Sequence, residues 1–315
     1  MQNIFRISIA HLIICLLCLI AFSCDSLEDK KGRFLLKGNN KLMESDYSSA
    51  IDYYNEAIKL DPDFENAYYN RGLAYSNMAK YDLAIHDFSK ALELNPSYQD
   101  AYYQRGIAYL DNGENYKSLA DAENLIELAP EDHRGYFIKG LTLEQLNRYQ
   151  ESLQSFSAAI EKDNNIPDLY VNRATIKYYL EDFESATTDL EKAEQINPNE
   201  ANIYNIKSLI AFEKEDLSAA ISWVEKAIGL NPSQAYYYNN RGLYLLFKGD
   251  LEKGLEDINL SLKQNSKNLF ALRNKGIYYY LKGNKALAIK YLEDVYKKDP
   301  AIKLTKKYLE LAQEI

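Results

Sequence analysis

The sequence predicts an all-α fold, in which about eight helix–turn–helix repeats of 34 residues stack into a solenoid. Three observations predict it: a proline series with a 34-residue step, small and aromatic residues that recur with the same period, and an apolar content of 47%. The 315-residue length alone would suggest two domains, but a solenoid grows by adding repeats. Six of the seven prolines obey the step: Pro62, Pro96, Pro130, Pro198, Pro232 and Pro300, with Asn164 and Ser266 in its two gaps.

Residues 1–23 are predicted to be a signal peptide. Arg6 supplies a positive charge, and the run from Ile7 to Phe22 is almost wholly apolar. As a helix this run spans roughly 24 Å, which is short of the ~30 Å hydrocarbon core of a bilayer. Its length therefore favours the apolar region of a signal peptide over a membrane span.

Cys24 directly follows Ala21-Phe22-Ser23, with small residues at −3 and −1 of the predicted cleavage site. This pattern resembles the lipobox of bacterial lipoproteins. The resemblance implies a lipid on Cys24 and a place in the bacterial cell envelope, most often the outer membrane, on either face. Ordinary secretion and an uncleaved N-terminal anchor are the alternatives. Residues 24–32 are expected to form a short polar tether.

Counting back from each proline defines repeats of 34 residues, in which position 1 is the first residue. Position 8 is Gly, Ala or Ser throughout, position 20 is equally small, and position 24 is apolar. Small residues let the two helices of a repeat approach closely, and the apolar residue fills the space between repeats. The eight repeats are 31–64, 65–98, 99–132, 133–166, 167–200, 201–234, 235–268 and 269–302.

These residues resemble the tetratricopeptide repeat (TPR) family, whose repeat is 34 residues long. The resemblance implies a right-handed superhelix, in which the first helix of each repeat lines the concave face.

The sequence also predicts the backbone conformation at the ends of the second helices and in one turn. Position 31 is Asn or Asp in seven of eight repeats, which predicts a left-handed residue that stops the helix before the proline. In the third repeat Tyr116 stands one place late, with Asn115 at the usual aromatic position. The loop 111–115 is therefore expected to be distorted.

Residues 303–315 are predicted to form a C-terminal capping helix. Leu304, Tyr308, Leu311 and Ile315 fall on one face at helical spacing, and charged residues cover the rest.

The groove positions of the first helices supply the candidate binding residues. Position 6 is often an amide, and a row of amides can hold a peptide backbone through both donors and acceptors. The alternative is that the amides serve neighbouring turns. Position 7 is always basic, either as an anion-binding row or because its aliphatic stem covers the core while the charge pairs with acidic neighbours. The amides are Asn70, Gln104, Asn172, Asn240 and Asn274.

Aromatic residues gather at the groove positions of the C-terminal repeats. They predict interface anchors for a partner, or platforms on which sugars stack. The set comprises Phe212, Tyr236, Phe247, Phe270 and Tyr280, with Arg273 nearby.

Other chemistry finds little support in the sequence. The net charge of −9 argues against a nucleic-acid partner. All three cysteines precede residue 25, so the repeats carry neither a disulfide nor a cysteine zinc site. Only three histidines occur, and no glycine-rich phosphate loop is present. We expect no catalysis, metal or cofactor.

The sequence thus predicts a membrane-tethered scaffold that binds an extended peptide or a helix in its groove, in envelope assembly or secretion. The alternative is a lipoprotein that captures glycans or nutrients. The partner itself is not encoded in any motif.

Overall fold

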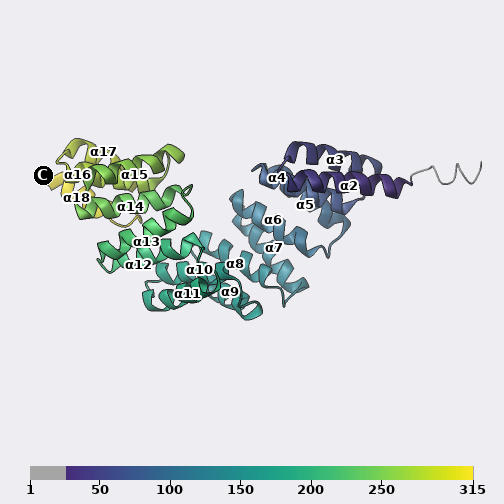
Figure 1. Ribbon diagram of the computed structural model, residues 1–315, viewed down its shortest axis with the longest axis horizontal. Coiled ribbons are helices and arrows are strands. Elements are labelled where there is room, and N and C mark those ends of the chain that lie inside the picture. The colour runs from purple at the N-terminus through teal and green to yellow at the C-terminus, as the bar shows by residue number, and fades with distance from the viewer. Residues whose placement is uncertain (1–25, 315) are drawn as a thin grey trace, which may run out of the picture. The chain divides into compact units, whose positions relative to one another are not determined.

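The computed structural model of the chain describes residues 26–314, and within that range it holds helices and turns without a strand (Figure 1). This confirms the predicted all-α repeat fold. The first helices of the repeats are α2 (Leu27–Met43), α4 (Glu65–Asn77), α6 (Gln99–Asp111), α8 (His133–Gln145), α10 (Pro167–Tyr179), α12 (Ala201–Glu213), α14 (Ala235–Lys248) and α16 (Leu269–Leu281). The second helices are α3 (Tyr47–Leu60), α5 (Tyr81–Leu94), α7 (Asn115–Leu128), α9 (Tyr149–Lys162), α11 (Phe183–Ile196), α13 (Leu217–Leu230), α15 (Leu251–Gln264) and α17 (Lys285–Lys298), and α18 (Thr305–Glu314) ends the chain.

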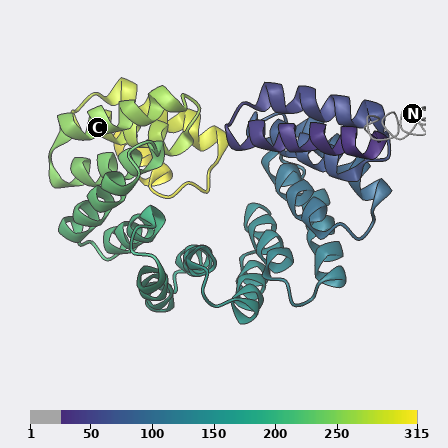
Figure 2. The ribbon, with the colours of Figure 1, turned by 45° about the vertical axis from the view of Figure 1, so that its right-hand side comes forward.

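The helices form two compact units, one up to Arg148 and one from Tyr149 onward. We call them the N-terminal and the C-terminal unit. In each unit, successive first helices contact one another, whereas no two second helices do so among residues 26–314. The first helices are therefore spaced more closely, which places them on the concave side of each unit. Figure 2 shows the same helices from a second direction.

The close approach of paired helices depends on position 8. A methyl group added to Gly72 would lie 2.7 Å from the Phe88 ring, and one added to Gly276 would lie 2.7 Å from Leu292. Phe88 and Leu292 occupy position 24 and are fully buried. The small residue and the large one are thus two halves of a single packing contact.

The turn between the two helices of a repeat has one conformation. Position 15 adopts positive φ in every repeat, at Ser45, Ala79, Gly113, Asn147, Glu181, Glu215, Gly249 and Gly283. The third repeat follows this rule, and its second helix begins at Asn115, in register with the others. The expected distortion of loop 111–115 is therefore wrong. The missing aromatic changes the surface and leaves the backbone unchanged.

The residue before each proline is not left-handed, contrary to expectation. Asp61 has φ −142° and ψ 97°, which is extended backbone. The proline ring excludes helical geometry from the residue before it. The preference for Asn or Asp has another cause: the side-chain oxygen accepts the N–H two residues on, forming an Asx turn. Such bonds occur at Asp61, Asn95, Asp163, Asn197, Asn231, Asn265 and Asp299.

The first helix begins earlier than the predicted tether allows. Ser26 caps α2 through a capping box with Asp29, and Lys31 pairs at 2.6 Å with Asp61, which directly follows α3. Residues 27–32, expected to be part of a tether, are helical because these contacts stabilise the first turns. The predicted signal peptide and Cys24 lie outside the described residues. In the part that the structure describes, no helix is both long and apolar enough to span a bilayer.

The C-terminal helix buries a different face from the predicted one. Thr305, Tyr308, Leu309 and Ala312 are buried, whereas Leu304 is only partly so. Tyr308 belongs to both the predicted and the observed face, and its ring contacts Phe247 of α14 and Tyr280 of α16.

Candidate protein-binding face

The predicted amide row lies on the first helices, where three of its five members link neighbouring repeats. Asn70 donates to Asn39 Oδ1, and Asn240 donates to Asn205 Oδ1, each at 2.9 Å. Asn172 instead bonds its own helix, at the carbonyl of Asp168. Each amide side chain has two N–H donors and two lone pairs, so these single bonds leave capacity for a ligand.

Asn274 and Gln104 differ from the other amides. Asn274 is fully buried and donates to both the backbone and the side-chain oxygen of Asn239. Gln104 is partly exposed. In the observed conformation Gln104 is accessible to a ligand, whereas Asn274 holds two helices together.

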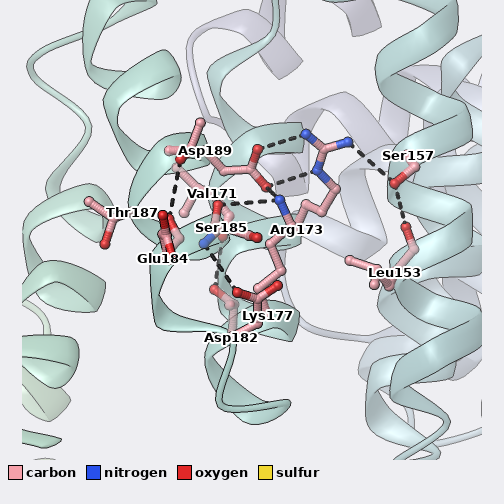
Figure 3. Close-up of polar contacts among 12 residues, drawn as sticks. Leu153, Ser157, Val171, Arg173, Lys177, Asp182, Glu184, Ser185, Thr187 and Asp189 are labelled. Atoms are coloured by element: carbon pink, nitrogen blue, oxygen red, sulfur yellow. Dashed lines mark hydrogen bonds and ion pairs between the residues drawn. The ribbon is translucent and has the colours of Figure 1, made fainter.

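The basic residues of position 7 pair with position 23 of the same repeat. Figure 3 shows one case, in which Arg173 of α10 meets Asp189 of α11 with two hydrogen bonds of 2.8 and 2.6 Å. Lys177 joins the same carboxylate at 2.7 Å. The bonds to Asp189 raise the pKa of the Arg173 guanidinium above its ordinary value. Equivalent Arg–Asp couples join Arg71 to Asp87, Arg105 to Asp121, and Arg241 to Asp257.

Where position 7 is lysine, position 23 is not an acid. Lys37 lies over the ring of Tyr53, Lys207 over Trp223, and Lys275 over Tyr291, with 5.0 to 5.8 Å to the ring centroids. The fourth repeat pairs Lys139 with Glu123 of the preceding repeat instead. Every position 7 therefore has a structural partner, which supports the interpretation that these charges pair within the array. The sequence analysis did not identify the aspartates of position 23 as the partners of position 7. The signal was present, because aspartate at position 23 occurs in the repeats that have arginine at position 7.

The Arg–Asp couples also connect successive repeats. Arg105 donates to Ser89 Oγ of the preceding second helix at 3.0 Å, and Arg71 donates to Asn55 Oδ1 at 2.6 Å. Each of these two guanidinium groups thus bridges two second helices.

The aromatic candidates of the C-terminal unit fall into two groups. Phe270 and Tyr236 are 52% and 38% exposed. Phe212, Phe247 and Tyr280 instead belong to a chain of rings: Phe212 contacts Phe247 at 5.5 Å, and both Phe247 and Tyr280 contact Tyr308 of α18.

Arg273 is buried rather than exposed. Its guanidinium donates to Asn274 Oδ1 at 2.9 Å and to the carbonyl of Lys303 at 3.0 Å, and no carboxylate pairs with it within residues 26–314. Burial lowers the pKa of Arg273 to about 10. This cation contrasts with the arginines of position 7, each of which meets an aspartate.

No group of three or more metal-ligating side chains lies among the residues that the structure describes. His86 approaches only the neighbouring Asp87, at 3.3 Å.

Comparisons with known proteins agree with this architecture. Family models described as "Tetratricopeptide repeat" match residues 65–98, and 103–166 with 171–235, and one described as "TPR repeat" matches residues 38–78. The Cut9 complex with Hcn1, from the APC/C, superposes with a TM-score of 0.69 at 14% identity, over 92% of this chain and 57% of that one. The chain thus spans little more than half of that relative's length.

Two bacterial structures are also similar. Pseudomonas aeruginosa pilF gives a TM-score of 0.55 at 17% identity, over 69% of this chain and 97% of that one. MamA from Desulfovibrio magneticus RS-1 gives 0.50 at 20% identity, over 55% and 98%. At these identities the likeness concerns the fold.

Proposed function

We propose that this chain, which is built of tetratricopeptide repeats, is a membrane-tethered scaffold that holds an extended peptide or a helix of a partner protein on its first helices. Its place is the bacterial cell envelope, with a role in assembly or secretion. TPR proteins bind protein or peptide partners, and this chain has the same arrangement of helices.

The distribution of exposed apolar side chains carries the proposal. On the first helices such residues fall mainly at positions 2, 6 and 13, which lie on the concave side of each unit. Apolar surface that stays exposed at repeated positions is typical of a protein-binding face. The residues are Leu36, Met43, Tyr179, Tyr236, Phe270 and Leu281.

Matched substitutions on the two helix layers test this face. Leu36→Asp and Phe270→Asp place a charge on the first helices, at side chains 61% and 52% exposed. Leu83→Asp and Leu260→Asp do so on second helices, at 47% and 38%. Cross-linking and mass spectrometry of solubilised membranes should show that only the first-helix variants lose protein partners.

If all four variants keep the partners of the wild type, the first-helix face is not the binding surface. Binding to polysaccharide in the absence of any protein partner would favour glycan capture instead.

The proposed membrane tether depends on cleavage of the Ser23-Cys24 bond, which would leave Cys24 as the lipidated N-terminus. The early start of α2 keeps the tether short. Ser26, two residues after Cys24, already caps the first helix, so a lipid on Cys24 would hold the first repeat at the membrane surface. The intact mass of the mature chain should show a diacylglyceryl group on Cys24. Cys24→Ser should release the chain from membranes, whereas Cys18→Ser, within the predicted signal peptide, should not. Retention of the Cys24→Ser chain without an acyl mass would contradict the tether.

A further inference from the structure

The chain's own C-terminal segment, residues 299–314, lies against the first helices of the C-terminal unit. Lys303 Nζ lies 3.0 Å from Glu181 Oε1 and 3.6 Å from Glu213 Oε1, which belong to the fifth and sixth repeats. The backbone carbonyl of Lys303 accepts a hydrogen bond from Arg273. In Figure 2 the yellow segment accordingly lies beside the green helices. The helix α18 packs against α17 and α16, and Lys303, which precedes it, reaches as far as the turn of the fifth repeat.

The ring of Tyr308 occupies the aromatic cluster predicted to anchor a partner. It meets Phe247 at 6.0 Å and Tyr280 at 5.4 Å, both edge to face, and it is 7% exposed. Behind it Phe212 stacks on Tyr244 at 4.9 Å. Edge-to-face ring pairs are a favourable geometry for binding. The cluster is therefore a filled aromatic site whose occupant belongs to the same chain.

The C-terminal segment fits the aromatic site imperfectly around residues 303–305, just before Tyr308. Leu304 adopts φ 69°, a conformation that a branched side chain rarely takes. The Thr305 hydroxyl is buried and has no hydrogen-bond partner within residues 26–314. The Arg273 cation is buried beside a carbonyl and an amide oxygen rather than a carboxylate. Each feature costs free energy while residues 299–314 lie against the first helices, and all three are at the N-terminal end of this segment.

The acidic end of the site is also specific. Tyr178 donates to Glu213 Oε1 at 3.1 Å and so orients the carboxylate that faces Lys303. Glu181 stands at the positive-φ turn of its repeat, which fixes its backbone. The lysine side chain itself is 62% exposed, so this contact can open without exposing the core.

We propose that the first-helix face of α10 to α16 is a peptide-binding site that residues 299–314 close, and that a partner segment must displace them. The partner carries the chemistry of the occupant: a lysine that reaches Glu181 and Glu213, and an aromatic ring about five residues later. This regulation rests on the scaffold function proposed above.

The test uses a fluorescent peptide of residues 299–315 and the full chain. In the Lys303→Glu/Tyr308→Ala chain the resident segment is loosened, so this chain should bind the peptide at least tenfold more tightly than the wild type. A peptide carrying Tyr308→Ala should bind at least tenfold more weakly. Lys306→Ala, an exposed change in the same segment, should leave the chain as closed as the wild type.

A variant with one substitution controls for the possibility that the double variant unfolds. Lys303→Glu alone alters a mostly exposed side chain and keeps Tyr308, so it should melt near the wild-type temperature. Hydrogen exchange should then rise in residues 302–309 while α12 and α14 stay protected. Unchanged exchange there, or equal peptide binding by wild-type and double-variant chains, overturns the proposal.

The outcome also separates this inference from the scaffold function. Partner capture that depends on Phe270, together with equal peptide binding by all chains, overturns closure and leaves the scaffold. Peptide binding by the opened chain without partner capture by any form overturns the scaffold function instead.

Discussion

At the scale of single residues, the identity of position 7 follows that of position 23. Arginine occurs where position 23 is aspartate, as at Arg71 and Asp87, and lysine lies opposite an aromatic ring in three of the other four repeats, as at Lys37 and Tyr53. A guanidinium matches a carboxylate with two parallel bonds, whereas an ammonium lies as a point charge over a ring face. The two kinds of couple serve the same place in the fold through different chemistry.

Removing one member of an Arg–Asp couple should therefore be costly. Asp87 is 1% exposed, so Asp87→Ala leaves Arg71 partly buried without its partner. We expect a loss of about 2–4 kcal/mol of unfolding free energy, because an unpaired buried charge is strongly unfavourable. Urea denaturation measures it, and Asp52→Ala, at an exposed site, should change it by less than about 0.5 kcal/mol.

Converting the couple tests the pairing itself. Arg71→Lys with Asp87→Tyr reproduces the residues of the first and eighth repeats, and it should recover at least half of the loss seen for Asp87→Tyr alone. A double-mutant cycle isolates this coupling. Simple additivity of the two changes would contradict the pairing rule.

Position 15 offers a third prediction at this scale. Ala79 is exposed and held at φ 54°, whereas Gly113 adopts φ 77° at the same position with open space around it. Ala79→Gly should raise the unfolding free energy by about 0.5–1 kcal/mol, since left-handed backbone is strained with a Cβ. Gly113→Ala should lower it by about 1–2 kcal/mol for the same reason. Equal signs for the two would exclude backbone strain as the cause.

At the scale of helices, position 8 sets the distance between partners. Gly72→Ala should lower the unfolding free energy by about 1–3 kcal/mol, because the added methyl group meets the Phe88 ring at 2.7 Å. Gly32→Ala, in α2 with nothing within 4 Å, should raise it by about 0.5–1 kcal/mol through helix propensity. Thermal melting of both variants checks the sign, and a gain for Gly72→Ala would disprove the packing role.

The contact between α11 and α12 predicts a pH dependence. The hydrogen bond from Lys207 holds the pKa of Glu194 below its ordinary value, and Tyr204 donates to the same carboxylate. A depressed pKa adds stability above the ordinary pKa that is lost as the pH falls through the folded value. Glu194→Gln should therefore be less stable than wild type at pH 7, and the difference should shrink between about pH 5 and pH 3. Denaturation at several pH values measures it, and a constant difference would contradict it.

At the scale of the whole molecule, the repeats should respond to damage locally. Within residues 26–314 the helices of a repeat contact only their own repeat and the repeats next to it, apart from the C-terminal segment. Stability then resembles a sum of repeat and interface terms. Hydrogen exchange of Gly72→Ala should show lost protection in α3 to α6, while α12 to α16 keep theirs. Uniform loss over both units would indicate a single cooperative core.

The fold could be predicted from the sequence because the residue patterns that define it depend on contacts between residues close together in the chain. Proline at the end of a second helix and small residues at position 8 each report the geometry of a few neighbouring residues. Contacts over longer distances resisted prediction: Asn70 and Asn39 meet only through the rotation of two helices, and Lys303 meets Glu181 across 122 positions. Tyr308 belonged to a recognisable amphipathic helix, but the left-handed Leu304 decides which face is buried.

The couples between positions 7 and 23 limit how such a gene can be rearranged. Duplication of a whole repeat that contains such a couple copies both partners together, whichever kind they are. A crossover between the two helices of unlike repeats would join an Arg71-type first helix to a Tyr53-type second helix, or a lysine helix to an Asp87-type helix. The first product leaves a partly buried guanidinium without its carboxylate. In the second, a buried carboxylate faces a lysine and loses the paired hydrogen bonds of an arginine. Viable recombination is therefore expected at the boundaries between repeats rather than at the turns within them.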